Sequence, residues 1–326
     1  MSPGALEFAV ERHLPDEDAV AREFISFLEA ASERRHRRGV MRRFNQPRHA
    51  GCVEAEFTVS DSLADELRVG LFAEPRTYTA RVRFASASSA TDRDKDIRGM
   101  SIRLEGVRGQ NLTAGATIQD FVLNSHPVMV APDTRTFLDL LRAVEAGGFR
   151  RVWYFLTHIR SARIGLAARQ HCASHLDIPY WSTTPYLFGD GRAVKYKARP
   201  TSARTSELPD TLTDDYLRQA MKRHLGEADA SFDFMVQLQK DPTRMPIEDA
   251  TAEWDTGESP FVSVARLRIP KQDFDTVDRM AWCEAVAFDP WCCLAEHRPL
   301  GNMNRARRRI YPELGRFRDE RNARVG

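Results

Sequence analysis

Apolar and polar residues alternate along this chain with two different periods, one typical of strands and one typical of helices. A period of two, rich in β-branched and aromatic residues, predicts a strand at 52–59 and another at 78–84. The same kind of pattern continues in five further segments: 96–104, 120–130, 180–196, 231–240 and 260–269. With this many strands, the chain is expected to form one large β-rich domain or two smaller ones.

Helical spacing of apolar residues flanks and separates these strands. It occurs in five segments: 17–31, 136–145, 151–169, 212–226 and a stretch that begins at Asn302. We expect Thr213 or Asp214 to cap the fourth of these helices. We expect Asn302 to cap the last helix and Pro312 to end it, which leaves Tyr311 on its final turn.

Composition narrows the classes of function. The chain has 326 residues, 42% of them hydrophobic, which is enough for a sizeable core. Its net charge is only +2, so neither nucleic acid nor an anionic membrane is implied as a partner. Six lysines leave 42 arginines among the 48 basic residues, and a guanidinium is the cation best suited to paired contacts with carboxylates. The sequence holds no apolar run long enough to span a bilayer.

The cysteines make an odd number without a zinc-binding spacing: Cys52, Cys172, Cys283, Cys292 and Cys293. This pattern predicts reduced thiols in a cytoplasmic protein. Residues 1–15 lack the basic-then-apolar pattern of a secretion signal, which agrees with a cytoplasmic location.

The strongest candidate chemistry lies near the C-terminus, where an Arg-x-x-x-Tyr-Pro motif spans 307–312. On a helix, Arg307 and Tyr311 stand at i and i+4, so the guanidinium is able to reach the phenol oxygen. A phenol has a pKa of about 10 and becomes an anionic ligand only when a cation or a metal stabilises its phenolate. Arg307 and a ferric ion would together supply that stabilisation.

This motif resembles the proximal helix of the haem catalases, in which a tyrosinate binds the iron. Segment 82–84, Val-Arg-Phe, resembles a catalase strand, and segment 96–99, Asp-Ile-Arg-Gly, resembles the strand that follows it. Segment 120–127 is similar to the family run that carries a catalytic asparagine, which falls on Asn124. Thirteen residues later, Phe137 matches a phenylalanine that packs on the porphyrin in that family.

The resemblance runs from about residue 43 to residue 318 and implies an α+β fold. We expect a catalase-like eight-stranded antiparallel β-barrel with flanking helices and without the C-terminal catalase domain. Residues 1–40 would form an N-terminal helical segment and residues 41–326 the barrel domain, with the proximal helix near 302–311. The chain looks similar to small catalase-related peroxidases and allene oxide synthases. We therefore expect a homodimer or a looser oligomer rather than the interlocked tetramer of full-length catalases.

The resemblance also implies haem b as the cofactor, with Tyr311 as the ligand of its iron and Phe137 packed on its ring. Arg43, Arg83 and Arg318 match, residue by residue, the family positions that hold the haem propionates. A buried carboxylate needs such charge-assisted donors, because an unpaired one is costly.

Two assignments of the distal residue stay open. Three matches in one segment place Gln46 where catalases have their distal histidine; these are Arg43, Arg48 and Gly51. A shift of three residues would put His49 there but would lose all three matches. We favour Gln46, whose amide is able to donate a hydrogen bond but cannot shuttle a proton.

A chain with Gln46 in that place is expected to dismutate hydrogen peroxide slowly. We therefore predict a haem-dependent oxidoreductase, peroxidase- or peroxygenase-like, that uses peroxide or an organic hydroperoxide on an organic substrate. Gln46, Asn124 and Arg307 are its predicted catalytic residues. Two alternatives remain: a haem-binding carrier or sensor without turnover, and a true small catalase that uses His49.

Overall fold

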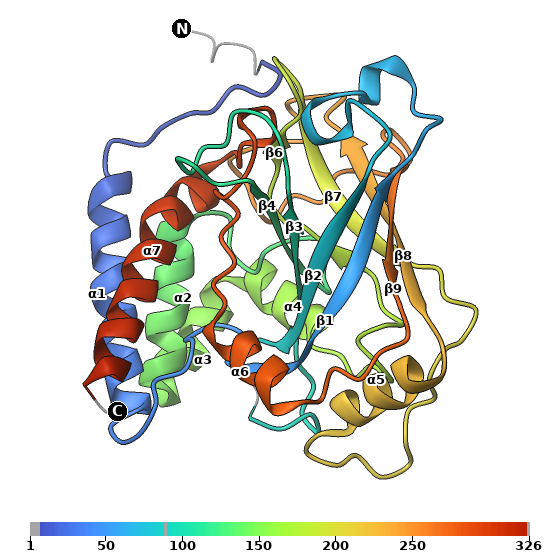
Figure 1. The fold of residues 1–326 in the computed structure, drawn as a ribbon. Coiled ribbons are helices and arrows are strands. Elements are labelled where there is room, and N and C mark those ends of the chain that lie inside the picture. The colour runs from blue at the N-terminus through green and yellow to red at the C-terminus, as the bar shows by residue number, and fades with distance from the viewer. Residues whose placement is uncertain (1–6, 88–89, 325–326) are drawn as a thin grey trace, which may run out of the picture.

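The computed structural model describes residues 7–87 and 90–324, and its central element is a closed β-barrel (Figure 1). The strands of the sheet are β1 Arg48–Val59, β2 Thr77–Ser86, β3 Arg98–Glu105, β4 Ile118–Asn124, β5 Tyr180–Trp181, β6 Tyr186–Leu187, β7 Ala193–Pro200, β8 Ala230–Leu238 and β9 Val262–Ile269. Antiparallel pairing gives the order β5-β4-β3-β2-β1-β9-β8-β7, and β5 pairs with β7 to close the ring, while β6 adds to β7. The predicted eight-stranded barrel is therefore confirmed.

Strand alternation divides the side chains between the interior of the barrel and its outer wall. The interior is aromatic: the ring of Phe121 lies 4.7 Å from that of Phe234, and Phe57 packs on both. On the outer wall, Gly99 of β3 stands between Ala85 of β2 and Asn124 of β4. Because these positions share one face, the wall carries polar groups beside a residue without a side chain.

Helices cover the barrel on the outside. They are α1 Glu17–Arg35, α2 Thr134–Ala146, α3 Gly148–Thr157, α4 Ile159–Ala168, α5 Tyr216–Glu227, α6 Val277–Ala285 and α7 Asn302–Ala323. Figure 1 shows α1, α2 and α7 side by side at the left of the barrel, and each of the three contacts the other two. Phe24 and Leu28 of α1 pack with Leu138 of α2 and Ile310 of α7, which fixes this layer by apolar burial.

The prediction that Pro312 ends the last helix is wrong, because α7 continues to Ala323 with Pro312 within it. Proline removes the hydrogen bond from its own nitrogen to the carbonyl of Arg308, four residues earlier. Both residues are exposed, so water is able to satisfy the freed carbonyl and the helix continues. Asn302 does not cap the helix either: Gly301 holds the cap position, and the Asn302 side chain accepts a hydrogen bond from the Thr134 backbone at 2.8 Å.

Two smaller predictions about helices also need correction, and one helix was missed. The segment expected as one helix at 151–169 is divided at His158 into α3 and α4. The cap residue of α5 is Asp215 rather than Thr213 or Asp214, and its side chain makes no capping hydrogen bond. Helix α6 was not predicted, although the Thr276 side chain accepts a hydrogen bond from the Arg279 backbone at its start.

The prediction of five reduced thiols is wrong for two of them, because Cys52 and Cys283 form a disulfide. Cys52 lies in β1 and Cys283 in α6, both buried, so the bond fastens α6 to the barrel wall. Cys172, Cys292 and Cys293 are free. The cysteine argument for a cytoplasmic location is thereby weakened, and that location stays a prediction. Within 7–87 and 90–324, every helix is too short or too polar to cross a membrane.

Candidate functional site

Gln46 and Asn124 meet on the outer wall of the barrel. Gln46 precedes β1 with φ +53°, and its backbone is held on both sides: its N–H donates to the Ala87 carbonyl at 3.0 Å, and its carbonyl accepts from Arg83 at 2.9 Å. The side-chain Nε2 donates to Oδ1 of Asn124 at 3.1 Å. Gly99 lies directly beneath, where a Cβ atom would come within 2.1 Å of Nε2 of Gln46. A glycine at 99 therefore makes room for the amide.

Three guanidinium groups gather beside this pair, from the chain before β1, from β2 and from α7. Arg83 is 3% exposed, and the Arg318 side chain is 13% exposed. Nη2 of Arg43 donates to the Val286 carbonyl. Within the described ranges, Nη1 of Arg43 and Nε of Arg83 are buried without a hydrogen-bond partner. Buried donors without acceptors are rare in folded proteins and indicate a place for an acceptor from outside the chain.

Electrostatics lead to the same conclusion. The pKa of Arg83 is lowered to about 9, first by burial and then by the charge of Arg43, with a further contribution from Arg318. The pKa of Arg43 is lowered to about 10, by burial and by the charge of Arg318. Because a guanidinium stays protonated in proteins, these shifts express the cost of holding three like charges together away from water. A bound anion would remove that cost.

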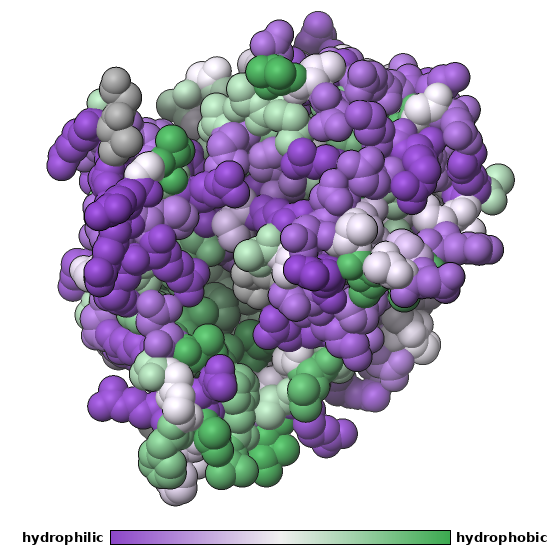
Figure 2. All heavy atoms as spheres, turned by 90° about the horizontal axis from the view of Figure 1, so that it is seen from below, coloured by the Kyte–Doolittle hydropathy of each residue, from purple (hydrophilic) through white to green (hydrophobic). Residues whose placement is uncertain are grey.

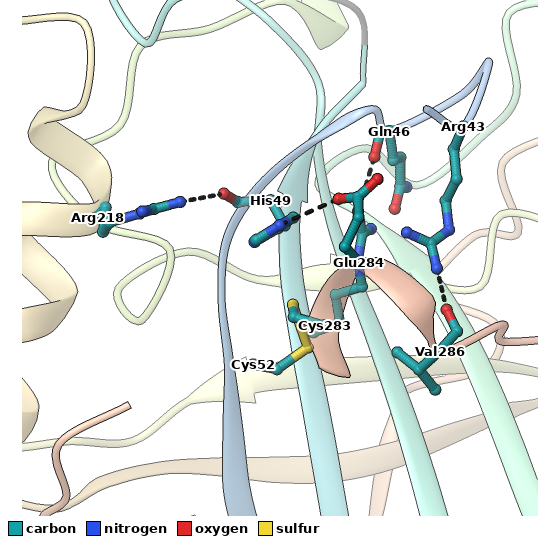
Figure 3. The surroundings of a disulfide bond; sticks show 9 residues. Arg43, Gln46, His49, Cys52, Arg218, Cys283, Glu284 and Val286 are labelled. Atoms are coloured by element: carbon teal, nitrogen blue, oxygen red, sulfur yellow. Dashed lines mark hydrogen bonds and ion pairs between the residues drawn. A yellow bond between two sulfur atoms is a disulfide. The ribbon is translucent and has the colours of Figure 1, made fainter. Parts of the chain in front are cut away.

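Glu284 of α6 is a partly buried carboxylate beside this cluster (Figure 3). Its negative charge opposes the lowering of the Arg43 and Arg83 pKa values, and it forms an ion pair with Nε2 of His49 at 3.2 Å. Burial lowers the pKa of His49, while the hydrogen bond to Glu284 opposes that shift. Figure 3 shows His49 pointing at Glu284. The Gln46 side chain instead donates to Asn124. The geometry thus puts Gln46 rather than His49 against Asn124.

Helix α7 presents Arg307, Tyr311 and Arg318 at i, i+4 and i+11, which lie on one helical face. Nη1 of Arg307 donates to Asn304 at 2.9 Å and more weakly to Thr184 at 3.3 Å. Arg307 makes no hydrogen bond to the Tyr311 hydroxyl in the part of the chain that the structure describes, so the expected contact between them is not formed here.

Tyr311 and Phe137 pack on the same apolar cluster between α1, α2 and α7, and both are partly buried. Phe137 and Met129 both pack against a second buried cluster, of Ala131, Ala250 and Met303, and the Met129 sulfur lies 3.9 Å from Nη2 of Arg307. Tyr311 therefore has apolar neighbours, and Arg307 stands one turn before it on α7.

Seen from below, the molecule is hollowed near the centre of this face, with strongly hydrophilic surface at the left and a hydrophobic surface beside the hollow (Figure 2). A planar group carrying two carboxylates fits this donor set, namely three guanidiniums, two of them with an unpaired buried N–H group, together with a phenol and an aromatic ring. These are the residues that could hold haem.

Sequence reasoning missed the groups that α6 contributes, Glu284 and the carbonyl of Val286. The available signal was the Asp275-Thr276 pair, a helix cap followed by the acidic Asp278, which predicts a helix start. The contact of Glu284 with His49 spans more than 200 residues and has no local signature.

Three solved structures align with this architecture over nearly the whole chain. A bacterial catalase aligns with a TM-score of 0.67 and 16% identity, over 94% of this chain and 62% of its own length. Catalase A from Saccharomyces cerevisiae aligns with a TM-score of 0.68 and 17% identity, over 98% of this chain and 68% of its own. A fungal catalase aligns with a TM-score of 0.66 and 16% identity, over 98% of this chain and 66% of its own. The chain thus has the fold of the catalases.

No protein-family model matches the chain, and no curated protein sequence matches it. This chain spans 62% of the bacterial catalase, less than two thirds of that protein. At 16–17% identity the likeness establishes the fold, and the chemistry has to be argued from the residues themselves.

Proposed function

We propose that this chain, which has the barrel fold of the catalases, is a haem-dependent oxidoreductase. The observation that carries the proposal is the cluster of Arg43, Arg83 and Arg318, three mostly buried cations with two unpaired donors. Two propionates are the ligands that such a cluster would neutralise. Tyr311 would be the iron ligand, and the charge of Arg307 would favour its phenolate.

When bound, ferric haem supplies the redox chemistry of peroxide cleavage. The chain's own residues determine which peroxide reaction is fast. Gln46 and Asn124 offer an amide pair that donates and accepts hydrogen bonds, so they would orient a peroxide against the barrel wall. Neither amide titrates near neutral pH, so neither is able to take a proton from one peroxide oxygen and return it to the other. Because the site lacks a group that transfers this proton, hydrogen peroxide dismutation should be slow.

We propose accordingly that the chain oxidises an organic substrate at the expense of peroxide or an organic hydroperoxide, as a peroxidase or peroxygenase does. A second candidate is a haem carrier or sensor without turnover, which the lack of a titrating group on Gln46 also favours. A small catalase that uses His49 is less well supported, because the His49 ring is paired with Glu284.

The test is an optical spectrum of the purified, haem-loaded chain before and after hydrogen peroxide, with oxygen release and donor oxidation recorded together. Donor oxidation with little oxygen supports the proposal, and a haem spectrum without any turnover supports the carrier. Vigorous oxygen release would contradict the role given to Gln46. Tyr311→Phe should change the haem spectrum, and an unchanged one would remove Tyr311 as the ligand.

Gln46→His supplies the missing base and is the sharpest variant. If the Gln46 position is the distal one, oxygen release should rise by about 10²–10⁴-fold, the usual contribution of a positioned proton-transfer group. The matched control is His49→Gln, which should leave oxygen release unchanged. A loss of activity in that control together with no gain in Gln46→His would reverse the assignment.

A further inference from the structure

The apolar side of α3 faces away from the protein. Its residues Phe149, Val152, Trp153 and Leu156 stand at i, i+3, i+4 and i+7, the spacing of one helical face. Such a face normally packs on a core, yet Phe149 is 77% exposed, Trp153 58% and Leu156 65%. Tyr154 lies on the buried side of α3, and its hydroxyl donates to the Thr136 carbonyl of α2 at 3.1 Å. The helix is thus anchored by one side and leaves its apolar side uncovered.

Helix α4 extends the same surface. Ile159 is 64% exposed and Leu166 77% exposed, again two turns apart on one helix. We call the set Phe149, Val152, Trp153, Leu156, Ile159 and Leu166 the apolar patch. It forms the hydrophobic surface at the lower edge of Figure 2, beside the hollow. A contiguous apolar surface of this kind on a folded protein indicates a binding site.

The charged residues of the segment that carries the apolar patch have a single sign. Between Glu145 and Asp177 the sequence has five arginines and no acidic residue; the arginines are Arg150, Arg151, Arg160, Arg163 and Arg169. The acidic neighbours are already engaged, since Glu145 pairs with Arg34 and Arg35, and Asp249 pairs with Arg160. The net charge of +2 for the whole chain therefore conceals a locally cationic surface.

We propose that the apolar patch docks on the surface of an anionic lipid bilayer. An amphipathic helix with Trp, Phe and Leu on one side and arginines at its flanks is the type that lies in the membrane interface. Trp153 and Phe149 stack with ring centroids 6.1 Å apart, an aromatic pair suited to the headgroup level. The arginines would contact lipid phosphates while the apolar side chains enter the acyl boundary.

A second copy of this chain is a poorer occupant of the patch. A twofold dimer through α3 would bring the same surface of both copies together, so the arginines of each copy would face those of the other. Like charges in a contact zone oppose association. The expected homodimer, if it forms, would use another face.

The proposal is tested by flotation of the full chain with phosphatidylcholine vesicles, with and without phosphatidylglycerol. Binding that needs the anionic lipid and weakens with salt is expected, together with a blue shift of tryptophan fluorescence that Trp153→Phe removes. Arg150→Glu with Arg151→Glu should lower partitioning at least about 25-fold, because each basic residue near an anionic surface contributes a factor of about five. Trp153→Ser with Leu156→Ser should lower it about tenfold or more.

A matched control reverses the charge of two arginines that lie far from the apolar patch. The C-terminal end of α4 lies beside the start of β3, because Arg169 donates to the Lys95 carbonyl. Arg108, in contrast, follows the opposite end of β3. Arg76→Glu with Arg108→Glu should leave vesicle binding within about twofold, since charges beyond the screening length contribute little.

Four results would overturn the proposal: no binding to anionic vesicles, equal binding to neutral ones, an equal loss in the control, and self-association that Trp153→Ser abolishes. Because none of these measurements needs haem, they are made with and without it, and their outcome does not depend on the proposed enzyme activity.

Discussion

Gly99 should be intolerant of even one added methyl group for as long as Gln46 is present. An ideal Cβ at position 99 would lie 2.1 Å from Nε2 and 2.4 Å from Cδ of Gln46, well inside the 3.0 Å that real Cβ atoms keep. Gly99→Ala must therefore displace the amide and break its 3.1 Å hydrogen bond to Asn124. The displacement costs about 1–3 kcal/mol as overpacking, and the lost hydrogen bond about 1 kcal/mol more.

One term acts in the opposite direction, and a double-mutant cycle separates it from the clash with Gln46. Alanine in a strand is better than glycine by about 0.5–1 kcal/mol, because glycine loses more conformational entropy on folding. Gly99→Ala should thus destabilise the wild-type chain by about 1–3 kcal/mol net. In a Gln46→Ala background the obstacle is gone, and the same substitution should be neutral or stabilising by up to about 1 kcal/mol. The coupling energy between the two positions is then about 1–4 kcal/mol, above the error of such cycles.

The assay is urea unfolding of the four chains of the cycle, followed by tryptophan fluorescence. Gly165→Ala is the matched control, because a Cβ there meets no atom within 4 Å among the described residues and should stabilise α4 equally in both backgrounds. An equal effect of Gly99→Ala in the presence and in the absence of Gln46 would refute the contact and, with it, the placement of Gln46 against Asn124.

Three further predictions concern the disulfide, the acid limit and the cationic cluster. Replacing Cys52 and Cys283 by serine should lower the free energy of unfolding by up to about 5 kcal/mol, the chain-entropy value for a loop of this length, and should remove any effect of reductant on the urea midpoint. Burial would raise the pKa of Glu17, but hydrogen bonds from Arg305 lower it to about 2, so its stabilisation is present above pH 4.5 and is lost as the pH falls toward 2. Glu17→Gln should flatten the acid unfolding curve in that window, and an unaltered slope in circular dichroism would contradict this. Arg43→Met should leave the haem-free chain as stable or more stable in thermal unfolding, while its haem affinity falls at least about tenfold, the value of one charged hydrogen bond; unchanged affinity in a haem titration would count against the cluster.

The strands could be predicted because each carries its own signal, whereas their closure into a barrel was implied by the resemblance to catalases. The alternation that buries Phe57, Phe121 and Phe234 is visible in the sequence without knowledge of the partner strands. The i, i+4 spacing of Arg307 and Tyr311 also predicts a shared helical face, and the structure places both on α7. These features depend on local periodicity, which the sequence displays directly.

What could not be predicted depends on tertiary context. Cys52 and Cys283 are 231 residues apart, and only the position of α6 on β1 brings them together. The continuation of α7 through Pro312 depends on solvent reaching one carbonyl. The α3 pattern predicts an apolar face, but whether that face is covered is a property of the whole fold.

The balance of charge around the cluster argues for the kind of ligand that it takes. Arg43, Arg83 and Arg318 bring three positive charges, and Glu284 supplies one negative charge, which it shares with His49. Asp319 also pairs with Arg318, but it is 70% exposed, so water screens it strongly. About two positive charges remain without a buried counterion, and two carboxylates would neutralise them. A monoanion would leave part of this cost in place, and a neutral ligand would leave all of it. The cluster should therefore discriminate among porphyrins by their carboxylates: haem should bind much more tightly than its dimethyl ester, and equal affinity for the two would show that the arginines serve only the fold.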